Sequence, residues 1–134
     1  MKTEVLLLAW AVALTVAQML VAVTGVMLQV GLPALAGNRD NLPPATGWAA
    51  RAQRAHRNML ENLVLFAALV LAVAFSGRES TLTLVGAHLF FWARLAYAGI
   101  YIAGIPWLRT GAWAVSFAGL VLLFIPLLQA PKAT

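Results

Sequence analysis

The chain has 134 residues, of which 63% are hydrophobic and 10% are charged, whereas soluble proteins average about 25% charged residues. These proportions exclude an ordinary soluble domain and predict an integral membrane protein with a single domain over residues 1–134. The formal charge is +5, but the basic residues are scattered singly, without the basic run or face that binds nucleic acid. Because the chain has no cysteine, a disulfide frame, a thiol nucleophile and a cysteine-based metal site are excluded. We expect no metal site.

Four apolar segments predict four membrane-spanning helices. The first, residues 5–30, has 26 positions without a charge, against the roughly 20 that a spanning helix needs. A segment rich in proline and glycine follows it, and we expect a loop there. The next spans are residues 48–75 and 81–103, joined by a tight turn, and the fourth is residues 110–129. The predicted fold is all-α, a bundle of four transmembrane helices.

The start of the second span carries a concentration of polar side chains. At about 100° per residue, five of them share an arc of roughly 100°, and we call these the helix-two stripe: Arg51, Arg54, Asn58, Glu61 and Asn62. His56 and Arg57 point away from it. The apolar remainder, Leu63 to Phe75, has 13 residues and is too short to cross a membrane alone. The helix-two stripe must therefore lie in the cytoplasmic half of the membrane or at its interface.

The third span carries a matching set of polar residues. Three of them share a face within about 60°: Arg94, Tyr97 and Tyr101. Depth counted from the turn at Gly77 predicts three pairs, Glu61 with Arg94, Asn58 with Tyr97, and Arg54 with Tyr101. Arginine or glutamate inside a span costs about 2.5 to 3.5 kcal/mol, so these residues indicate a functional site. Their surplus of donors predicts an anionic ligand.

The positive-inside rule gives the orientation. Five arginines lie in or beside the loop after the first span and the turn before the fourth: Arg39, Arg51, Arg54, Arg57 and Arg109. Three basic residues lie on the opposite side: Lys2, Arg78 and Lys132. We therefore expect a multi-pass protein with the first loop and the site facing the cytoplasm. Short loops suit a bacterial inner membrane, and an endomembrane would obey the same physics.

Two motifs resemble the MAPEG superfamily, the membrane-associated proteins of eicosanoid and glutathione metabolism, which includes bacterial members. RAHRNMLENL in the second span resembles the family pattern R-A-x-x-N-x-x-E, and ARLAYAGIY in the third resembles R-x-x-Y-x-x-x-Y. The four-span layout agrees, so the resemblance covers nearly the whole chain. It implies a homotrimer that holds glutathione as a co-substrate between neighbouring subunits, near the cytoplasmic face.

The resemblance also implies roles for individual residues. Those that bind glutathione are Arg51, Arg54, His56, Asn58, Glu61, Asn62, Arg94, Tyr97 and Tyr101. Arg109 and Tyr101 are the candidate catalytic residues that stabilise the thiolate, because a thiol with a pKa near 8.5 is mostly protonated at neutral pH and only its anion attacks. The implied activity is a glutathione transferase or peroxidase acting on lipophilic electrophiles or hydroperoxides that enter from the membrane lipids. Unlike its relatives, the first span has no arginine near its cytoplasmic end, which weakens the case for activation of a second substrate.

Other hypotheses stay open at this stage. The basic residues of the helix-two stripe could reach toward lipid headgroups, Glu61 and Arg94 could form a structural ion pair, the tyrosines could be interface aromatics, and Arg109 could be a topology signal. A small multidrug-type transporter could exchange protons on Glu61, although the arginines around it would repel a cationic drug. A non-catalytic membrane binding or structural subunit would keep the same bundle. His88 is expected to be a packing residue.

Overall fold

The computed structural model describes residues 2–129, which form five helices and no strand: α1 (Thr3–Val30), α2 (Leu32–Ala36), α3 (Gly47–Ser76), α4 (Thr81–Ala103) and α5 (Pro106–Leu128). All but α2 are long and apolar enough to cross a membrane. The predicted all-α fold with four spans is therefore confirmed. Lys132, which contributed to the predicted orientation, lies outside the described residues.

Two features differ from the sequence prediction. The segment after α1, expected to be a loop throughout, contains the short helix α2, which begins after Gly31 with its φ of 85°. Helix α5 begins at Pro106 rather than at Thr110. Proline suits the first position of a helix because its missing N–H would have no partner there. Because α5 starts earlier, Arg109 lies in the first helical turn of α5. The sequence prediction had placed it in the connection between the third and fourth helices.

The ends of α3 and α4 follow from capping chemistry. Gly77 and Gly104 end these helices in the left-handed conformation, which glycine adopts without the steric cost of a Cβ. Ser80 and Thr83 form a capping box at the start of α4, which satisfies N–H groups that have no partner within the helix. The turns that join α3 to α4 and α4 to α5 are consequently short. Each of these helices therefore runs antiparallel to the one before it.

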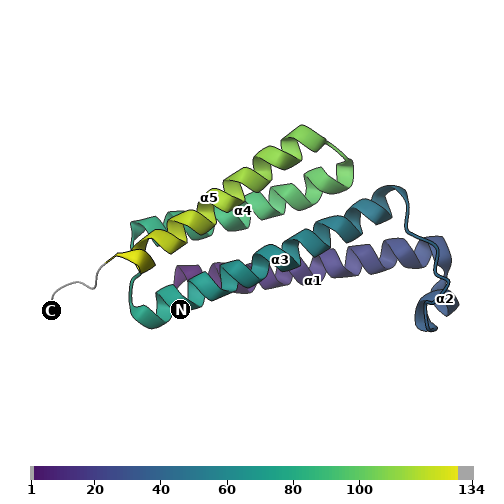
Figure 1. The fold of residues 1–134 in the computed structure, drawn as a ribbon, viewed down its shortest axis with the longest axis horizontal. Helices are drawn as coiled ribbons and strands as arrows, with labels where there is room; N and C mark the ends of the chain where they lie inside the picture. Colours follow the sequence, from purple (N-terminus) through teal and green to yellow (C-terminus); the bar gives the residue numbers. More distant parts are fainter. Residues whose placement is uncertain (1, 130–134) are drawn as a thin grey trace.

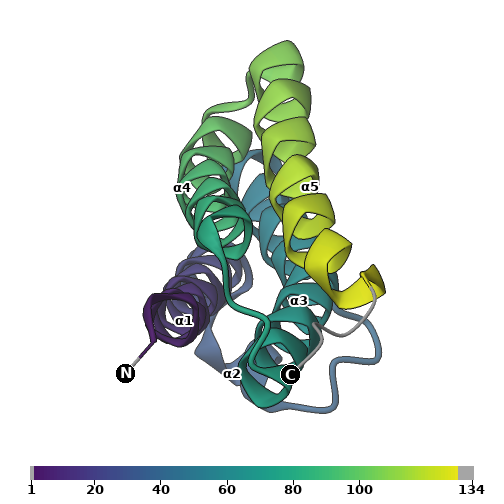
Figure 2. The ribbon, with the colours of Figure 1, turned by 90° about the vertical axis from the view of Figure 1, so that its left-hand side faces the viewer.

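The four long helices form two pairs (Figure 1). α1 packs along α3, α4 packs along α5, and the pairs meet mainly through contacts of α4 with α1 and α3. The view along the bundle shows the helices around one shared interior (Figure 2). The start of α3, the end of α4 and the start of α5 lie at one end, which we call the α4–α5 end. The opposite end, with the α3–α4 turn, is the α3–α4 end.

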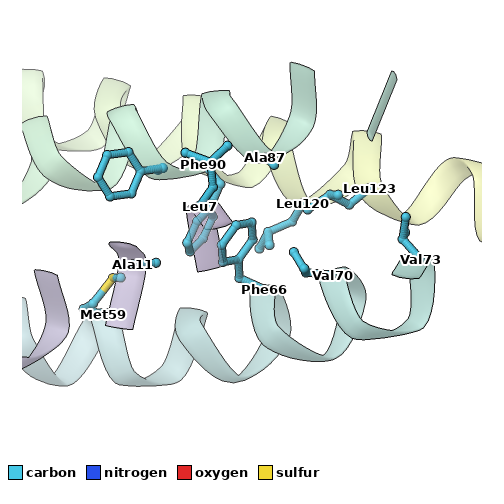
Figure 3. Packing of buried hydrophobic residues seen from close by; sticks show 11 residues of the cluster. Leu7, Ala11, Met59, Phe66, Val70, Val73, Ala87, Phe90, Leu120 and Leu123 are labelled. Atoms are coloured by element: carbon cyan, nitrogen blue, oxygen red, sulfur yellow. The ribbon is translucent and has the colours of Figure 1, made fainter. Parts of the chain in front are cut away.

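Contacts between the helices fix their heights relative to one another. Phe66 of α3 stacks on Phe90 of α4 with ring centroids 4.1 Å apart, in the middle of the buried cluster shown in Figure 3. α4 and α5 touch through their backbones, because a Cβ added to Gly86 would lie 2.7 Å from the Gly119 carbonyl oxygen. Close glycine contacts of this kind are typical of helices that associate in membranes.

Polar contacts close the α3–α4 end. The hydroxyl of Thr83 lies 3.3 Å from the buried carboxylate of Glu4, which ties α4 to α1. Arg78 donates hydrogen bonds to the carbonyl oxygens of Pro126 and Gln129. Carbonyl groups in the last turn of a helix have no partner within it, so Arg78 caps α5.

Candidate functional site

Arg94 is the most deeply buried charged residue at the α4–α5 end. Its side chain is 1% exposed, and its Nη2 donates to Oδ1 of Asn58 at 2.8 Å. The guanidinium carbon lies 4.1 Å from the ring centroid of Tyr97, within the range of a cation–π contact. Its Nε and Nη1 have no hydrogen-bond partner among residues 2–129. A buried cation with unused donors is costly, so these two atoms are suited to an incoming acceptor.

Asn58 is held in place by its neighbour one turn along α3. Nδ2 of Asn62 donates to the Asn58 backbone oxygen at 2.8 Å and lies 3.2 Å from Oδ1 of Asn58. The Asn58 amide oxygen thus accepts from both Arg94 and Asn62. Asn62 therefore contributes to the site by orienting Asn58.

Tyr101 connects two further arginines. Nε of Arg54 donates to the Tyr101 hydroxyl at 3.1 Å, which confirms one of the three pairs predicted from depth. The guanidinium of Arg109, from α5, lies 4.6 Å from the centroid of the same ring. Tyr97 meets Tyr101 edge to face at a centroid separation of 5.5 Å. The tyrosines therefore link the arginines of α3, α4 and α5 into one cluster.

An open pocket of about 250 Å³ lies within this cluster. Its lining comes from α3, α4 and α5: Asn58, Tyr97, Arg109, Thr110 and Trp113. Thr110 and Trp113 were not among the predicted site residues. The spacing of Arg109 and Trp113, four residues apart, is the signal that places both on one helix face. This spacing applies only if Arg109 belongs to the helix, and the helix predicted from the sequence began one residue later, at Thr110.

Glu61 does not face Arg94. Its side chain is exposed, and it forms no ion pair within the described part of the chain. The buried face of α3 contains Met59 and Phe66, and Asn58 lies at the edge of that face. Glu61 is rotated about 60° beyond Asn58, away from the interior. The predicted pair is therefore wrong, because Asn58 takes the position opposite Arg94.

Arg51 and His56 lie apart from the pocket. Nε of Arg51 donates to the Ile102 carbonyl oxygen at 2.8 Å and thus caps the end of α4. His56 lines another hollow, of about 310 Å³, between α1, α3 and the loop that contains Arg39. Its Nδ1 is buried without a hydrogen-bond partner among residues 2–129. Within one chain, His56 therefore faces away from the arginine cluster.

The remaining histidine also lies outside the site. His88 is exposed on α4, and its Nδ1 accepts a hydrogen bond of 3.2 Å from the indole of Trp92. No group of histidine and acidic side chains within residues 2–129 is arranged to hold a metal ion.

The cluster has a clear chemical preference. It contains three arginines, Arg54, Arg94 and Arg109, together with two tyrosine hydroxyls and the amide of Asn58. Guanidinium groups bind carboxylates through two parallel hydrogen bonds. Within the described residues no carboxylate forms a salt bridge with any of these arginines. The cluster is therefore suited to an anion with acceptor oxygens or an anionic sulfur.

Comparison with known proteins gives one match. The family model described as the MAPEG family matches residues 5–128, nearly the whole chain. Searches among curated proteins and among solved structures find no match.

Proposed function

Because the chain belongs to the MAPEG family, whose members are membrane proteins of glutathione and eicosanoid metabolism and include both enzymes and non-catalytic proteins, we propose that it is a glutathione-dependent membrane transferase or peroxidase. It activates the thiol of glutathione for attack on lipophilic electrophiles or hydroperoxides. The observation that carries this proposal is the buried Arg94 guanidinium, whose Nε and Nη1 have no partner among residues 2–129, beside a pocket lined by Arg109.

Glutathione suits the charges of this site. The tripeptide has two carboxylates, one amine and one thiol, so it brings the acceptors that the cluster lacks. Arg94 and Arg54 bind the carboxylates, and Asn58 and Tyr97 contact the peptide from the pocket wall. Glu61 lies on the outer surface of α3 and is the acid available to the amine. Arg51 supports this end of the bundle through its bond to Ile102.

Arg109 and Tyr101 act on the sulfur. The Arg109 guanidinium lines the pocket and lies against the Tyr101 ring. A guanidinium near a thiol favours the thiolate, and each pKa unit is worth about 1.4 kcal/mol. The Tyr101 hydroxyl can donate a second hydrogen bond to the anion. In the transferase reaction the thiolate attacks the electrophilic carbon, the carbon–sulfur bond forms, and the leaving group departs with the electron pair of its former bond.

The complete site requires a homotrimer. His56 faces away from the arginine cluster of its own chain, so it reaches glutathione only from a neighbouring subunit. The exposed position of Glu61 suits the same arrangement. The membrane is the bacterial inner membrane, and the α4–α5 end faces the cytoplasm, where glutathione is dissolved. The transporter hypothesis is disfavoured, because Glu61 lies on the outer surface of α3 rather than inside the bundle.

The test is a glutathione titration of the purified protein in detergent. Thiolate absorbance in the ultraviolet and thermal stability are followed in the same samples, and oligomeric state is measured in parallel. We expect saturable stabilisation together with a thiolate signal at neutral pH. Stabilisation without a thiolate signal would indicate a non-catalytic binding subunit. No response of the folded trimer to millimolar glutathione would refute the proposed function.

A further inference from the structure

Two arginines lie outside the arginine cluster and line the hollow that contains His56. Arg57 comes from α3, and Arg39 comes from the loop that follows α2. The hollow has a volume of about 310 Å³, and Gln53 adds an amide to its polar lining. No acidic side chain lines it, and neither arginine forms a salt bridge within residues 2–129. The positive charge of the hollow is therefore not balanced by the chain itself.

The loop that forms one wall of the hollow has a defined conformation. It lies beside the end of α1 (Figure 1). At its base, the side-chain amide of Gln29 donates to the Thr46 carbonyl oxygen at 2.8 Å and accepts from the Thr46 N–H at 3.0 Å. Arg39 has a φ of 66°, which is uncommon for a residue other than glycine, and its Nε donates to the Leu35 carbonyl oxygen at 2.7 Å. Arg39 is thus positioned by the loop through one of its three guanidinium nitrogens.

The lining of the hollow changes from polar to apolar with depth. α3 runs inward from the α4–α5 end, so Gln53 and Arg57 lie nearer that end than Leu60 does. α1 runs in the opposite direction, so Met19 lies deeper than Val23. The polar groups therefore lie toward the membrane surface, and the apolar wall lies toward the hydrocarbon.

Exposed apolar residues continue this wall toward the middle of the membrane. On α1 they recur about one helical turn apart, at Met19, Val16 and Val12, and on α3 Val64 continues the face. We call these four residues the apolar track. The eleven residues from Val23 to Val12 span about 16 Å along the helix axis, close to half of the roughly 30 Å hydrocarbon thickness. The apolar track therefore reaches about as deep as an acyl chain of one leaflet.

We propose that the hollow and the apolar track bind an anionic phospholipid of the cytoplasmic leaflet. Arg39 and Arg57 bind the phosphate by charge-assisted hydrogen bonds, and an acyl chain lies along the apolar track. A hollow of about 310 Å³ is at the lower end of the range for ligand sites, which suits a headgroup rather than a whole lipid. Basic pockets between transmembrane helices on the cytoplasmic side are suited to anionic headgroups. The inference uses the orientation proposed above and does not depend on glutathione chemistry.

Other occupants match these features less well. A soluble anion has no group that would lie on the apolar track, and a zwitterionic lipid leaves the charge of Arg39 and Arg57 unbalanced. Glutathione of a neighbouring subunit is a further alternative, because His56 lines the same hollow. Glutathione is fully polar, however, and would leave the apolar track uncovered. The experiment therefore measures lipid and glutathione binding together.

The experiment uses the purified full-length protein in detergent. Dioleoyl phosphatidylglycerol, dioleoyl phosphatidylcholine and glycerol phosphate are added separately, and bound molecules are counted by native mass spectrometry while thermal stability is followed. The test variants are Arg57→Gln and the double variant Arg39→Gln/Arg57→Gln. Lys2→Gln/Arg78→Gln is the matched control, because it removes the same number of positive charges from the α3–α4 end.

We expect the natural protein to bind phosphatidylglycerol more tightly than phosphatidylcholine. Arg57→Gln should weaken phosphatidylglycerol binding about fivefold and the double variant about 25-fold, since each basic residue near an anionic headgroup contributes a factor of about five. Phosphatidylcholine binding should not change, and the control should keep the natural preference. Glutathione affinity and the thiolate signal should be the same in all these proteins.

Four results would overturn the inference. The first is equal binding of the two lipids to the natural protein, and the second is the same loss in the control as in the double variant. Binding of glycerol phosphate as tight as that of phosphatidylglycerol would indicate a site for soluble anions. Weaker glutathione binding with unchanged lipid binding in the double variant would assign the hollow to glutathione of a neighbouring subunit. A natural protein that prefers phosphatidylglycerol but forms no thiolate would support this inference and remove the proposed function alone.

Discussion

The two ends of the bundle use polar side chains differently. At the α3–α4 end, Glu4 meets Thr83, Lys2 pairs with Glu79, and Arg78 caps α5. None of the buried polar atoms without a partner in residues 2–129 lies at that end. At the α4–α5 end, by contrast, two of the three guanidinium nitrogens of Arg94 lack a partner within the same residues.

This contrast distinguishes polar residues with a structural role from those of the candidate site, which polarity alone does not do. Both ends contain charged residues in an apolar bundle, and both bear the cost of removing them from water. At the α3–α4 end the charges are balanced by groups of the same chain, and that is sufficient for a structural role. At the α4–α5 end the donors exceed the acceptors among residues 2–129, and this excess supports the glutathione ligand proposed above. The following substitutions test whether the ends differ in this way.

The largest effect is expected for Arg109→Leu. The variant should lose about 100-fold in kcat, a typical cost of removing one donor to an anionic reaction centre, and its thiolate signal should fall. Glutathione affinity should change little, because Arg54 and Arg94 hold the carboxylates. The measurements are steady-state turnover, thiolate absorbance and glutathione binding.

Arg78→Leu is the matched control for this prediction, since it removes the same charge from the α3–α4 end. Assayed below its melting temperature, it should keep full turnover. Comparable losses of turnover in both variants would show that the ends do not differ in function.

The next effect in size is expected for Asn58→Leu. This variant removes the only side-chain acceptor that Arg94 has within residues 2–129, so a buried guanidinium is left without a partner. The free energy of unfolding should fall by about 2 kcal/mol, and glutathione should bind more weakly. Asn62→Leu should act in the same direction with a smaller effect, since Asn62 only orients Asn58. Unfolding curves and glutathione titrations of both variants would check this order, and a stable Asn58→Leu protein with normal affinity would contradict it.

Much of the fold could be predicted because it depends on features that are read directly along the sequence. Apolar length specifies a span regardless of its neighbours, and helical periodicity places Arg94 and Tyr101 on one face. The Arg54–Tyr101 contact followed from matching depth on two antiparallel helices, and the structure confirms it. These features need only helix geometry and a turn position.

Other features depend on rotation and on exact helix boundaries. Depth places Glu61 level with Arg94 but does not specify which face of α3 meets α4, and the packing of Phe66 on Phe90 turns Glu61 outward. Trp113 was missed because the fourth helix was predicted to begin at Thr110, although Pro106 is a recognised starting residue. The role proposed for His56 needs a neighbouring subunit, because within its own chain His56 lines a different hollow, and no periodicity within one chain specifies such a contact.

At the α3–α4 end, a smaller and purely structural effect is expected. Arg78→Leu removes the hydrogen bonds to the last carbonyl groups of α5. The free energy of unfolding should fall by about 1 kcal/mol, without any change in glutathione affinity or in thiolate formation. Thermal unfolding with and without glutathione measures both quantities. Weaker glutathione binding in this variant would mean that the two ends are coupled, and the contrast between them would need revision.

The smallest effect concerns the surface pair of Lys2 and Glu79. The hydrogen bond from Lys2 lowers the pKa of Glu79 below its ordinary value of 4.5. Because the folded-state pKa lies below the unfolded one, the pair stabilises the fold at pH values above 4.5, and this contribution is lost as the pH falls through the folded-state pKa. Lys2→Ala should therefore melt slightly below the natural protein at neutral pH, and the difference should shrink on acidification. Melting curves across this pH range test it; a difference independent of pH would mean that Lys2 acts through packing. Since Glu79 already has its partner, glutathione should not change this difference, whereas it should change the stability of every variant that alters the Arg94 cluster.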